Sequence, residues 1–89
     1  MSTTKRVAVL GGGSFGTAVA NMIADNNHSV CIWLRNEQQA SEINLDRVNS
    51  LYLPDLKLNE NVSANTELAE VVSNVDFVFM AVPSKSCRE

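Results

Sequence analysis

Residues 6–16 read RVAVLGGGSFG, a short apolar run that leads into a cluster holding all four glycines of the 89-residue chain. The run from Arg6 to Leu10 is rich in β-branched side chains, which is typical of a strand. From Ser14 onward, apolar residues recur at helical spacing. This segment therefore predicts a strand that enters a glycine turn and then opens a helix.

The glycines at positions 11, 13 and 16 fit the spacing G-x-G-x-x-G, which gains specificity when it follows a strand and opens a helix. Gly11 permits the tight turn, Gly13 lets a pyrophosphate approach the backbone, and Gly16 lets the helix pack closely on the sheet. The free backbone N–H groups of Ser14 and Phe15, together with the helix dipole, can then hold the phosphates. A glycine turn without a ligand is the alternative, whereas a P-loop is excluded because no Gly-Lys-Ser/Thr follows.

Strand and helix patterns alternate along the rest of the chain, which indicates a parallel α/β sheet with right-handed crossovers. The predicted strands span residues 6–10, 30–34, 61–64 and 77–82, and the predicted helices span 14–26, 36–48 and a segment with Thr66 as its N-cap. The strand at 30–34 is apolar on both faces, so we expect helices on both sides of the sheet. The predicted fold class is a Rossmann-type doubly wound parallel sheet, the first and incomplete part of a dinucleotide-binding domain.

Apolar residues follow helical spacing in the predicted helices. In the first helix the apolar residues that recur at helical spacing are Phe15, Ala18, Val19, Met22 and Ile23. The second helix should face inward with Ala40, Ile43 and Val48, and the third should bury Leu68, Val71, Val72 and Val75.

The composition and charge of the chain exclude several classes of function. Seven Lys and Arg against ten Asp and Glu give a net charge of −3, which argues against a dedicated binder of nucleic acid or anionic membranes. No apolar run approaches the ~20 residues of a membrane span. Lys5-Arg6 and the apolar run after it mimic the start of a secretory signal, but the glycine cluster interrupts the mimic. With only Cys31 and Cys87, we expect a reduced, cytoplasmic protein.

The residue at the end of the second predicted strand bears on whether the cofactor is NAD or NADP. Sites that prefer NAD place an acidic residue there to bond the ribose 2′-hydroxyl. This chain has Arg35 at that place and no acid between Asp25 and Glu37. A guanidinium can bind a 2′-phosphate or stack on adenine. We therefore expect NADP or NAD as cofactor, without a strong preference for NAD. A solvated arginine at a strand end is the alternative.

Other chemistry-bearing residues form no site. We expect His28 at the surface or in a cap, and Trp33 in the core. The two cysteines lack metal-ligand spacing, and no set of nucleophile, base and acid can be assembled. The predicted site therefore contains no metal ligand and no catalytic residue.

Four segments together resemble the N-terminal domain of bacterial NAD(P)-dependent sn-glycerol-3-phosphate dehydrogenases. They occur in order at matching intervals over essentially the whole chain: GGGSFGTA at 11–18, WLR at 33–35, NSLYLP at 49–54 and VPS at 82–84. The glycine segment is shared by many dehydrogenases, whereas the third and fourth segments are far more specific to this family.

The resemblance implies a function. The family interconverts glycerol 3-phosphate and dihydroxyacetone phosphate by hydride transfer with a nicotinamide, usually as ketone reduction that feeds glycerophospholipid synthesis. By position, Ser14 and Phe15 would contact the cofactor at the phosphate turn, and Arg35 and Tyr52 would lie at its adenosine end. Pro83 would border the nicotinamide half. The partners implied are the two small-molecule substrates, with no nucleic acid or membrane span, and a homodimer is compatible with the resemblance.

The chain also departs from the family pattern. Asn27 stands where the family usually has Gly, and Asn suits the same backbone. The family's catalytic and cofactor-contacting lysines, and its helical substrate domain, lie beyond residue 89. We therefore expect residues 1–89 to be the truncated N-terminal dinucleotide-binding domain of a longer protein, without turnover alone. One sheet edge and part of one face should be exposed and invite self-association.

Two further function classes stay open. A non-catalytic nucleotide-sensing module would use a similar turn, but it normally keeps an acid where Arg35 stands. Another small dehydrogenase, of the 2-hydroxyacid or 3-hydroxyacid type, would not explain the NSLYLP segment at 49–54.

Overall fold

The computed structural model describes residues 4–11, 13–50 and 53–81. Four strands and three helices alternate along these residues, in the predicted order. The strands are β1 (Arg6–Leu10), β2 (Ser29–Trp33), β3 (Val62–Asn65) and β4 (Phe77–Met80). The helices are α1 (Ser14–Asp25), α2 (Glu37–Asp46) and α3 (Leu68–Val71).

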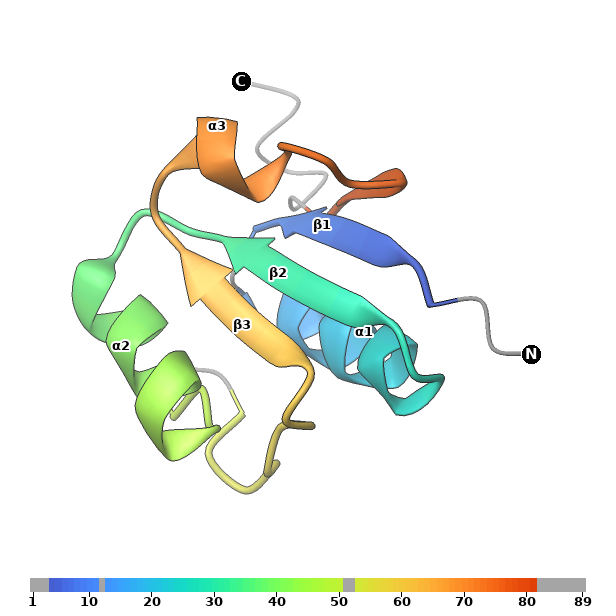
Figure 1. The fold of residues 1–89 in the computed structure, drawn as a ribbon. Coiled ribbons are helices and arrows are strands. Elements are labelled where there is room, and N and C mark those ends of the chain that lie inside the picture. The colour runs from blue at the N-terminus through green and yellow to red at the C-terminus, as the bar shows by residue number, and fades with distance from the viewer. Residues whose placement is uncertain (1–3, 12, 51–52, 82–89) are drawn as a thin grey trace.

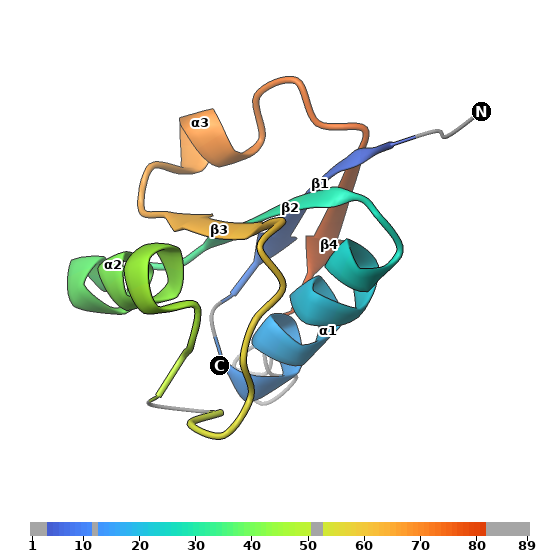
Figure 2. The same cartoon turned by 60° about the horizontal axis from the view of Figure 1, so that its bottom comes forward.

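All strand pairs are parallel, and the order across the sheet is β3-β2-β1-β4. The chain therefore first builds outward from β1 to β3 and then crosses back to the other side of β1. Helices α1 and α2 lie on one face of the sheet and α3 on the other (Figures 1 and 2). This arrangement confirms the predicted Rossmann-type fold, and it puts a topological switch point between β1 and β4.

The core lies between the sheet and the two longer helices. Parallel register places Val9 beside Ile32, and Val30 beside Val62, and all four side chains are buried. Ala40 and Ile43 of α2 are buried as predicted, whereas Val48 is half-buried and lies beyond the end of the helix. Helix α1 ends as the sequence predicts, because Asn27 takes a left-handed conformation with φ 69°.

Helix α1 does not bury the largest of the apolar residues that recur at helical spacing. The residues that α1 buries are Gly16, Thr17, Ala20 and Ala24. Phe15 and Met22 are 64% and 63% exposed, while Ile23 is partly buried against the core. The physical reason is the short distance between α1 and the sheet. Small side chains let α1 lie close to the sheet, so the large apolar residues of the helix are displaced to its flanks.

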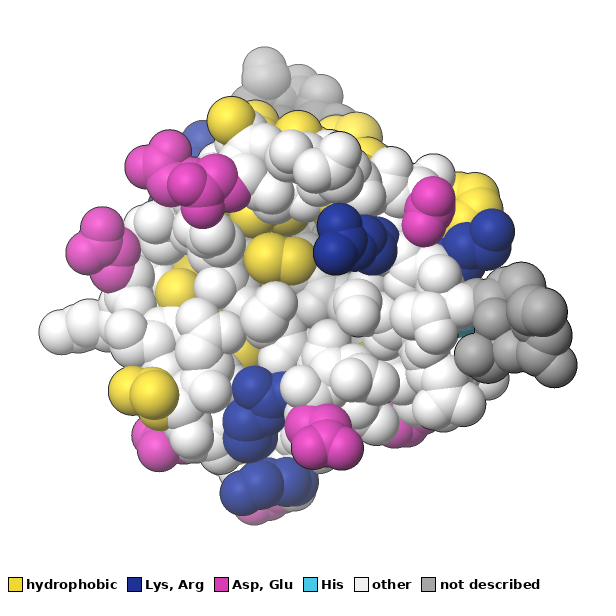
Figure 3. All heavy atoms as spheres, viewed as in Figure 1, with side chains coloured by type: hydrophobic (Ala, Val, Ile, Leu, Met, Phe, Trp, Pro, Cys, Tyr) yellow, Lys and Arg dark blue, Asp and Glu magenta, His cyan; other side chains and the backbone are white. Residues whose placement is uncertain are grey.

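The opposite face of the sheet is covered less than predicted. Helix α3 is a single turn with Glu67, not Thr66, as its N-cap, and Val71 is its one buried residue. Leu68 and Val72 are exposed instead of lining a buried side. Trp33 of β2 is accordingly half-buried. Figure 3 views this face, and apolar side chains are visible at its centre, with acidic and basic side chains interspersed around them.

Strand β4 pairs with β1 along one edge, and all four of its residues are exposed. The expectation of an exposed edge and face is confirmed for these residues. No helix among the described residues is long and apolar enough to cross a membrane.

Candidate dinucleotide-binding site

The glycine turn forms directly after β1, as predicted. Gly11 has a φ of 124°, a conformation that glycine adopts without strain and other residues rarely do. Its N–H donates to the Trp33 carbonyl over 2.9 Å, which ties the turn to the end of β2. The turn therefore lies at the carboxyl edge of the parallel strands, where doubly wound folds bind ligands.

Gly16 has a steric role. A Cβ at this position would collide with the backbone carbonyl oxygen of Gly11 and would lie 3.2 Å from the Ala81 side chain. Helix α1 thus packs against both the end of β1 and the residue after β4. This is the close helix–sheet contact that the sequence assigned to Gly16.

Gly13 differs from both. It is the N-cap of α1, with an ordinary φ of −77°, and a Cβ built on it would meet no described atom within 4 Å. Neither backbone conformation nor packing requires glycine here. Open space beside a helix N-terminus is what a pyrophosphate needs, so the position fits the predicted group.

The N-terminus of α1 also suits an anion. It has no side-chain cap and no acidic residue in its first turn. Ser14 and Phe15 are exposed there, and the first N–H groups of a helix have no intrahelical partner. A phosphate would satisfy these donors and would interact favourably with the helix dipole.

Arg35 lies two residues beyond β2, on the same edge of the sheet as the turn. Its side chain is exposed, and its guanidinium carbon lies 6.0 Å from the centroid of the Trp33 ring. The Trp33 indole N–H donates to the Thr66 carbonyl over 3.1 Å, which fixes the ring. Trp33 is therefore not the core residue that was predicted. It is a half-buried support for Arg35, and its place inside an apolar strand does not predict this role.

Phe15 reaches across the switch point toward β4. Its ring centroid lies 6.2 Å from that of Phe79, with the planes tilted by 48°. The sequence linked Phe15 to the site only through its backbone. The aromatic pair adds an apolar wall between α1 and β4.

Some predicted site residues cannot be placed. Tyr52 and Pro83 lie outside the described residues. Asn49 and Leu53, which are described, form an isolated antiparallel β-bridge. His28, expected in a cap or at the surface, is half-buried and accepts a hydrogen bond at Nδ1 from the Lys5 backbone N–H, over 3.0 Å. Among the described residues, no group of three or more His, Cys, Asp or Glu side chains could hold a metal ion.

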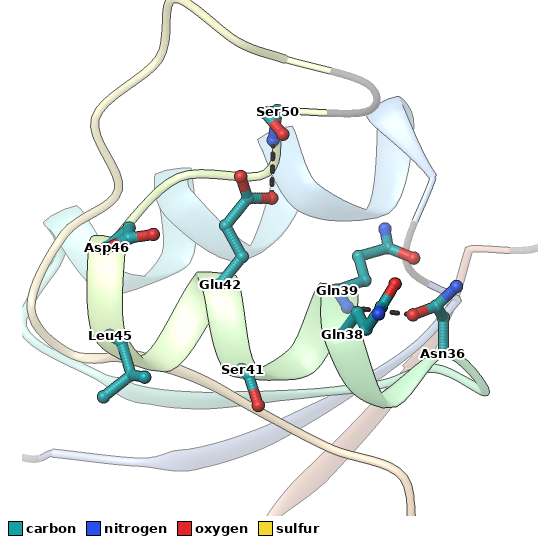
Figure 4. A pocket seen from close by; sticks show the side chains of 8 residues that line it. All are labelled: Asn36, Gln38, Gln39, Ser41, Glu42, Leu45, Asp46 and Ser50. Carbon is teal, nitrogen blue, oxygen red and sulfur yellow. Dashed lines mark hydrogen bonds between the residues drawn. The ribbon is translucent and has the colours of Figure 1, made fainter.

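A surface hollow of about 520 Å³ lies elsewhere, along the outer side of α2 (Figure 4). Its lining residues are Asn36, Gln38, Gln39, Ser41, Glu42, Leu45, Asp46 and Ser50. The Ser50 hydroxyl and backbone N–H, which both bond Glu42, lower the pKa of that carboxyl. The described residues that line the hollow include no glycine turn and no cationic side chain, so they do not suit a phosphate.

The parallel sheet and the glycine turn after its first strand define the class of this chain, a Rossmann-type dinucleotide-binding fold. The model of one family, the NAD-dependent glycerol-3-phosphate dehydrogenase N-terminus, matches residues 6–89. The chain belongs to this family.

Individual relatives agree. The chain is 48% identical, over its full length, to glycerol-3-phosphate dehydrogenase [NAD(P)+] of Teredinibacter turnerae, of which it covers 26%. It is also 48% identical over its full length to the enzyme of the same name from Saccharophagus degradans and covers 25% of it. The chain thus spans about a quarter of the length of these relatives.

Solved structures show the same fold. Glycerol-3-phosphate dehydrogenase of Coxiella burnetii superposes with a TM-score of 0.82 at 31% identity, over 91% of this chain and 25% of that one. The Saccharomyces cerevisiae enzyme superposes with a TM-score of 0.84 at 28% identity, over 93% and 27%.

Proposed function

We propose that this chain is the NAD(P)-binding part of an oxidoreductase that interconverts sn-glycerol 3-phosphate and dihydroxyacetone phosphate and feeds glycerophospholipid synthesis. Family membership supports the reaction. The observation that carries the cofactor assignment is the turn from Gly11 to Gly16, hydrogen-bonded to the strand that ends beside Arg35. We propose that the protein is cytoplasmic and acts on small molecules rather than on nucleic acid. A homodimer is compatible with the family resemblance.

Each proposed site residue has a distinct task. The backbone N–H groups of Ser14 and Phe15 bind the pyrophosphate, and Gly13 leaves room for it. Arg35 binds a 2′-phosphate or stacks on adenine. Tyr52 borders the adenosine side, as the family resemblance implies.

The nicotinamide of the cofactor, when bound, supplies the group that accepts or donates hydride. Residues 1–89 contribute binding and orientation. Catalytic lysines in the family lie beyond residue 89, so we propose that these 89 residues alone have no reductase activity.

Substitution of Arg35 tests the cofactor assignment. We expect Arg35→Ala to weaken NADPH binding about tenfold, because a charge-assisted hydrogen bond to the 2′-phosphate is lost. NADH, which lacks this phosphate, should lose less than about threefold, since only stacking is removed. Isothermal titration calorimetry with both cofactors measures the two ratios, and Lys57→Ala serves as a control of equal charge change. Equal losses for the two cofactors would remove Arg35 from the 2′-phosphate.

A nucleotide-sensing module without catalysis is the second candidate. It predicts an acid at the end of β2, where this chain has Arg35. Reductase activity of a protein that joins this chain to the family's substrate domain, assayed with dihydroxyacetone phosphate and NADPH, decides between the two.

A further inference from the structure

Among the described residues, two polar side chains are fully buried: Thr17 of α1 and Asn49 of the loop after α2. Asn49 Nδ2 donates to Thr17 Oγ1 over 2.8 Å, and Asn49 Oδ1 accepts from Gln39 Nε2 over 3.0 Å. Buried polar groups destabilise a fold unless they are hydrogen-bonded. The Asn49 amide therefore holds both partners in defined positions. We call these three residues the Asn49 bridge.

One end of the bridge lies on the phosphate turn. Thr17 is in the first turn of α1, and its backbone N–H donates to the Gly13 carbonyl over 2.9 Å. Because Gly13 begins the helix, a shift of Thr17 moves the donors proposed to bind the pyrophosphate. Sequence patterns do not predict this role, since Thr17 directly follows the glycine motif and has the spacing of an ordinary helix residue.

The other end of the bridge lies close in sequence to Arg35, which we propose contacts the adenosine end of the cofactor. Gln39 is in the first turn of α2, and its backbone N–H donates to Oδ1 of the N-cap Asn36 over 3.0 Å (Figure 4). Asn36 follows Arg35 directly in the chain. The position of Gln39 therefore sets where α2 begins and, through it, where Arg35 leaves the sheet.

Asn49 is itself fastened to α2 independently of α1. The N–H of the next residue, Ser50, donates to Glu42 Oε1 over 3.0 Å, and the N–H of Leu53 donates to the Asn49 carbonyl over 2.7 Å. Figure 4 shows Glu42 and Ser50 reaching toward each other above the helix. The loop and α2 thus form one unit, and the bond to Thr17 joins that unit to α1.

We propose that Asn49 is a positioning residue that sets the separation between the phosphate turn and Arg35, so that one dinucleotide binds to both. This inference rests on the proposed function. A ligand with two anchored groups gains affinity only when both anchors are correctly spaced, whereas a ligand with one anchored group is insensitive to the spacing.

The test compares a two-anchor ligand with a one-anchor ligand. NADPH spans both anchors, and adenosine 2′-monophosphate meets only the Arg35 end. For Thr17→Val, which keeps the shape of the side chain and removes its hydroxyl, we expect NADPH affinity to fall about fivefold to tenfold. The affinity for adenosine 2′-monophosphate should fall less than about twofold, because its single anchor is intact. Thr17→Ser keeps the hydroxyl and should restore NADPH affinity.

Gln39→Met provides an independent variant, because it breaks the other bond of Asn49 and lies on α2 rather than on α1. We expect the same selective loss for NADPH. Its matched control is Gln38→Met, the same change at the exposed neighbour. Circular dichroism checks that each variant is folded, and calorimetry gives the dissociation constants.

The outcomes separate the two claims. If the unchanged protein binds NADPH and both ligands weaken equally in the variants, or neither weakens, the positioning role is overturned while the proposed function stands. A folded, unchanged protein that fails to bind NADPH overturns the proposed function and the positioning role with it.

Discussion

At the scale of single residues, identical residues serve different ends in the glycine turn. Gly11 is needed for its positive φ and Gly16 for the space that a carbonyl oxygen occupies beside it. At Gly13, neither the backbone conformation nor packing against the described residues requires glycine. The motif spacing predicted the roles of Gly11 and Gly16, because both follow from local geometry that any such strand-turn-helix unit shares, and room for a pyrophosphate at Gly13 stays a prediction.

Alanine substitutions should separate these roles. Gly16→Ala forces a methyl group against the Gly11 carbonyl, so we expect a loss of about 2–3 kcal/mol in the free energy of unfolding. Gly13→Ala should cost less than about 1 kcal/mol, the scale of a change at a helix N-cap. It should nevertheless weaken NADPH binding strongly, because the methyl group enters the proposed pyrophosphate space. Urea denaturation and calorimetry measure the two effects, and a Gly13→Ala protein with full NADPH affinity would contradict the assignment.

The Cys31 thiol should react slowly. Burial raises its pKa, and the hydrogen bond with Ser63 offsets part of this rise. Because the thiolate is the reactive form, we expect Cys31 to be alkylated by iodoacetamide much more slowly in the folded chain than in urea at the same pH. Peptide mapping by mass spectrometry follows this cysteine separately from Cys87. Equal rates in the two conditions would contradict a half-buried thiol with a raised pKa.

At the scale of secondary-structure elements, the order of strands and helices could be predicted, but the buried face of α1 could not. Periodicity favours the largest apolar side chains, such as Phe15 and Met22. In the structure, close approach to the sheet selects the smallest ones instead, such as Ala20 and Ala24. The single turn of α3 was also missed, since apolar spacing over 68–75 does not reveal that only Val71 reaches the sheet. The Asn49 bridge depends on contacts 10 and 32 residues apart in sequence, which local patterns do not encode.

Paired substitutions in α1 test its orientation. Met22→Gln changes an exposed side chain, so we expect the free energy of unfolding to change by less than about 0.5 kcal/mol. Ala20→Leu inserts a large side chain at a fully buried position and should cost about 1–3 kcal/mol. Urea denaturation gives both values. The opposite order would show that Met22, and not Ala20, faces the sheet.

The link between α2 and its loop should weaken in acid. The bonds from Ser50 lower the pKa of Glu42, so the ionised carboxylate is favoured in the folded state. The resulting stabilisation is present above the ordinary pKa of Glu, about 4.3, and is lost as the pH falls through the lowered value. We expect Glu42→Gln to have a lower melting temperature than the unchanged chain at pH 7, with the difference shrinking below about pH 4. A difference that is constant with pH would show that ionised Glu42 does not stabilise the loop.

At the scale of the whole molecule, apolar surface is unevenly covered. Helices α1 and α2 bury one face, whereas all of β4 is exposed and its outer edge has no partner among the described strands. The four residues of β4 include no charged side chain and no proline, the usual devices that protect an edge.

This edge should drive self-association of the 89-residue chain. We expect the sedimentation coefficient to rise with protein concentration. Val78→Lys should reduce the rise, because a lysine on an edge strand opposes pairing with another strand. Leu45→Lys, an identical charge change on the exposed side of α2, should leave it unaltered. A chain that stays monomeric at high concentration would contradict the prediction.

The most direct test of the central claim is a titration of the chain with NADPH and, separately, NADH, followed by the fluorescence of Trp33, its only tryptophan. Trp33 lies beneath Arg35 and accepts the hydrogen bond from the Gly11 N–H at its carbonyl, so it reports on both proposed anchors. We expect saturable quenching, with NADPH binding at least as tightly as NADH. A folded chain whose fluorescence responds to neither cofactor would contradict the assignment of this turn to a dinucleotide.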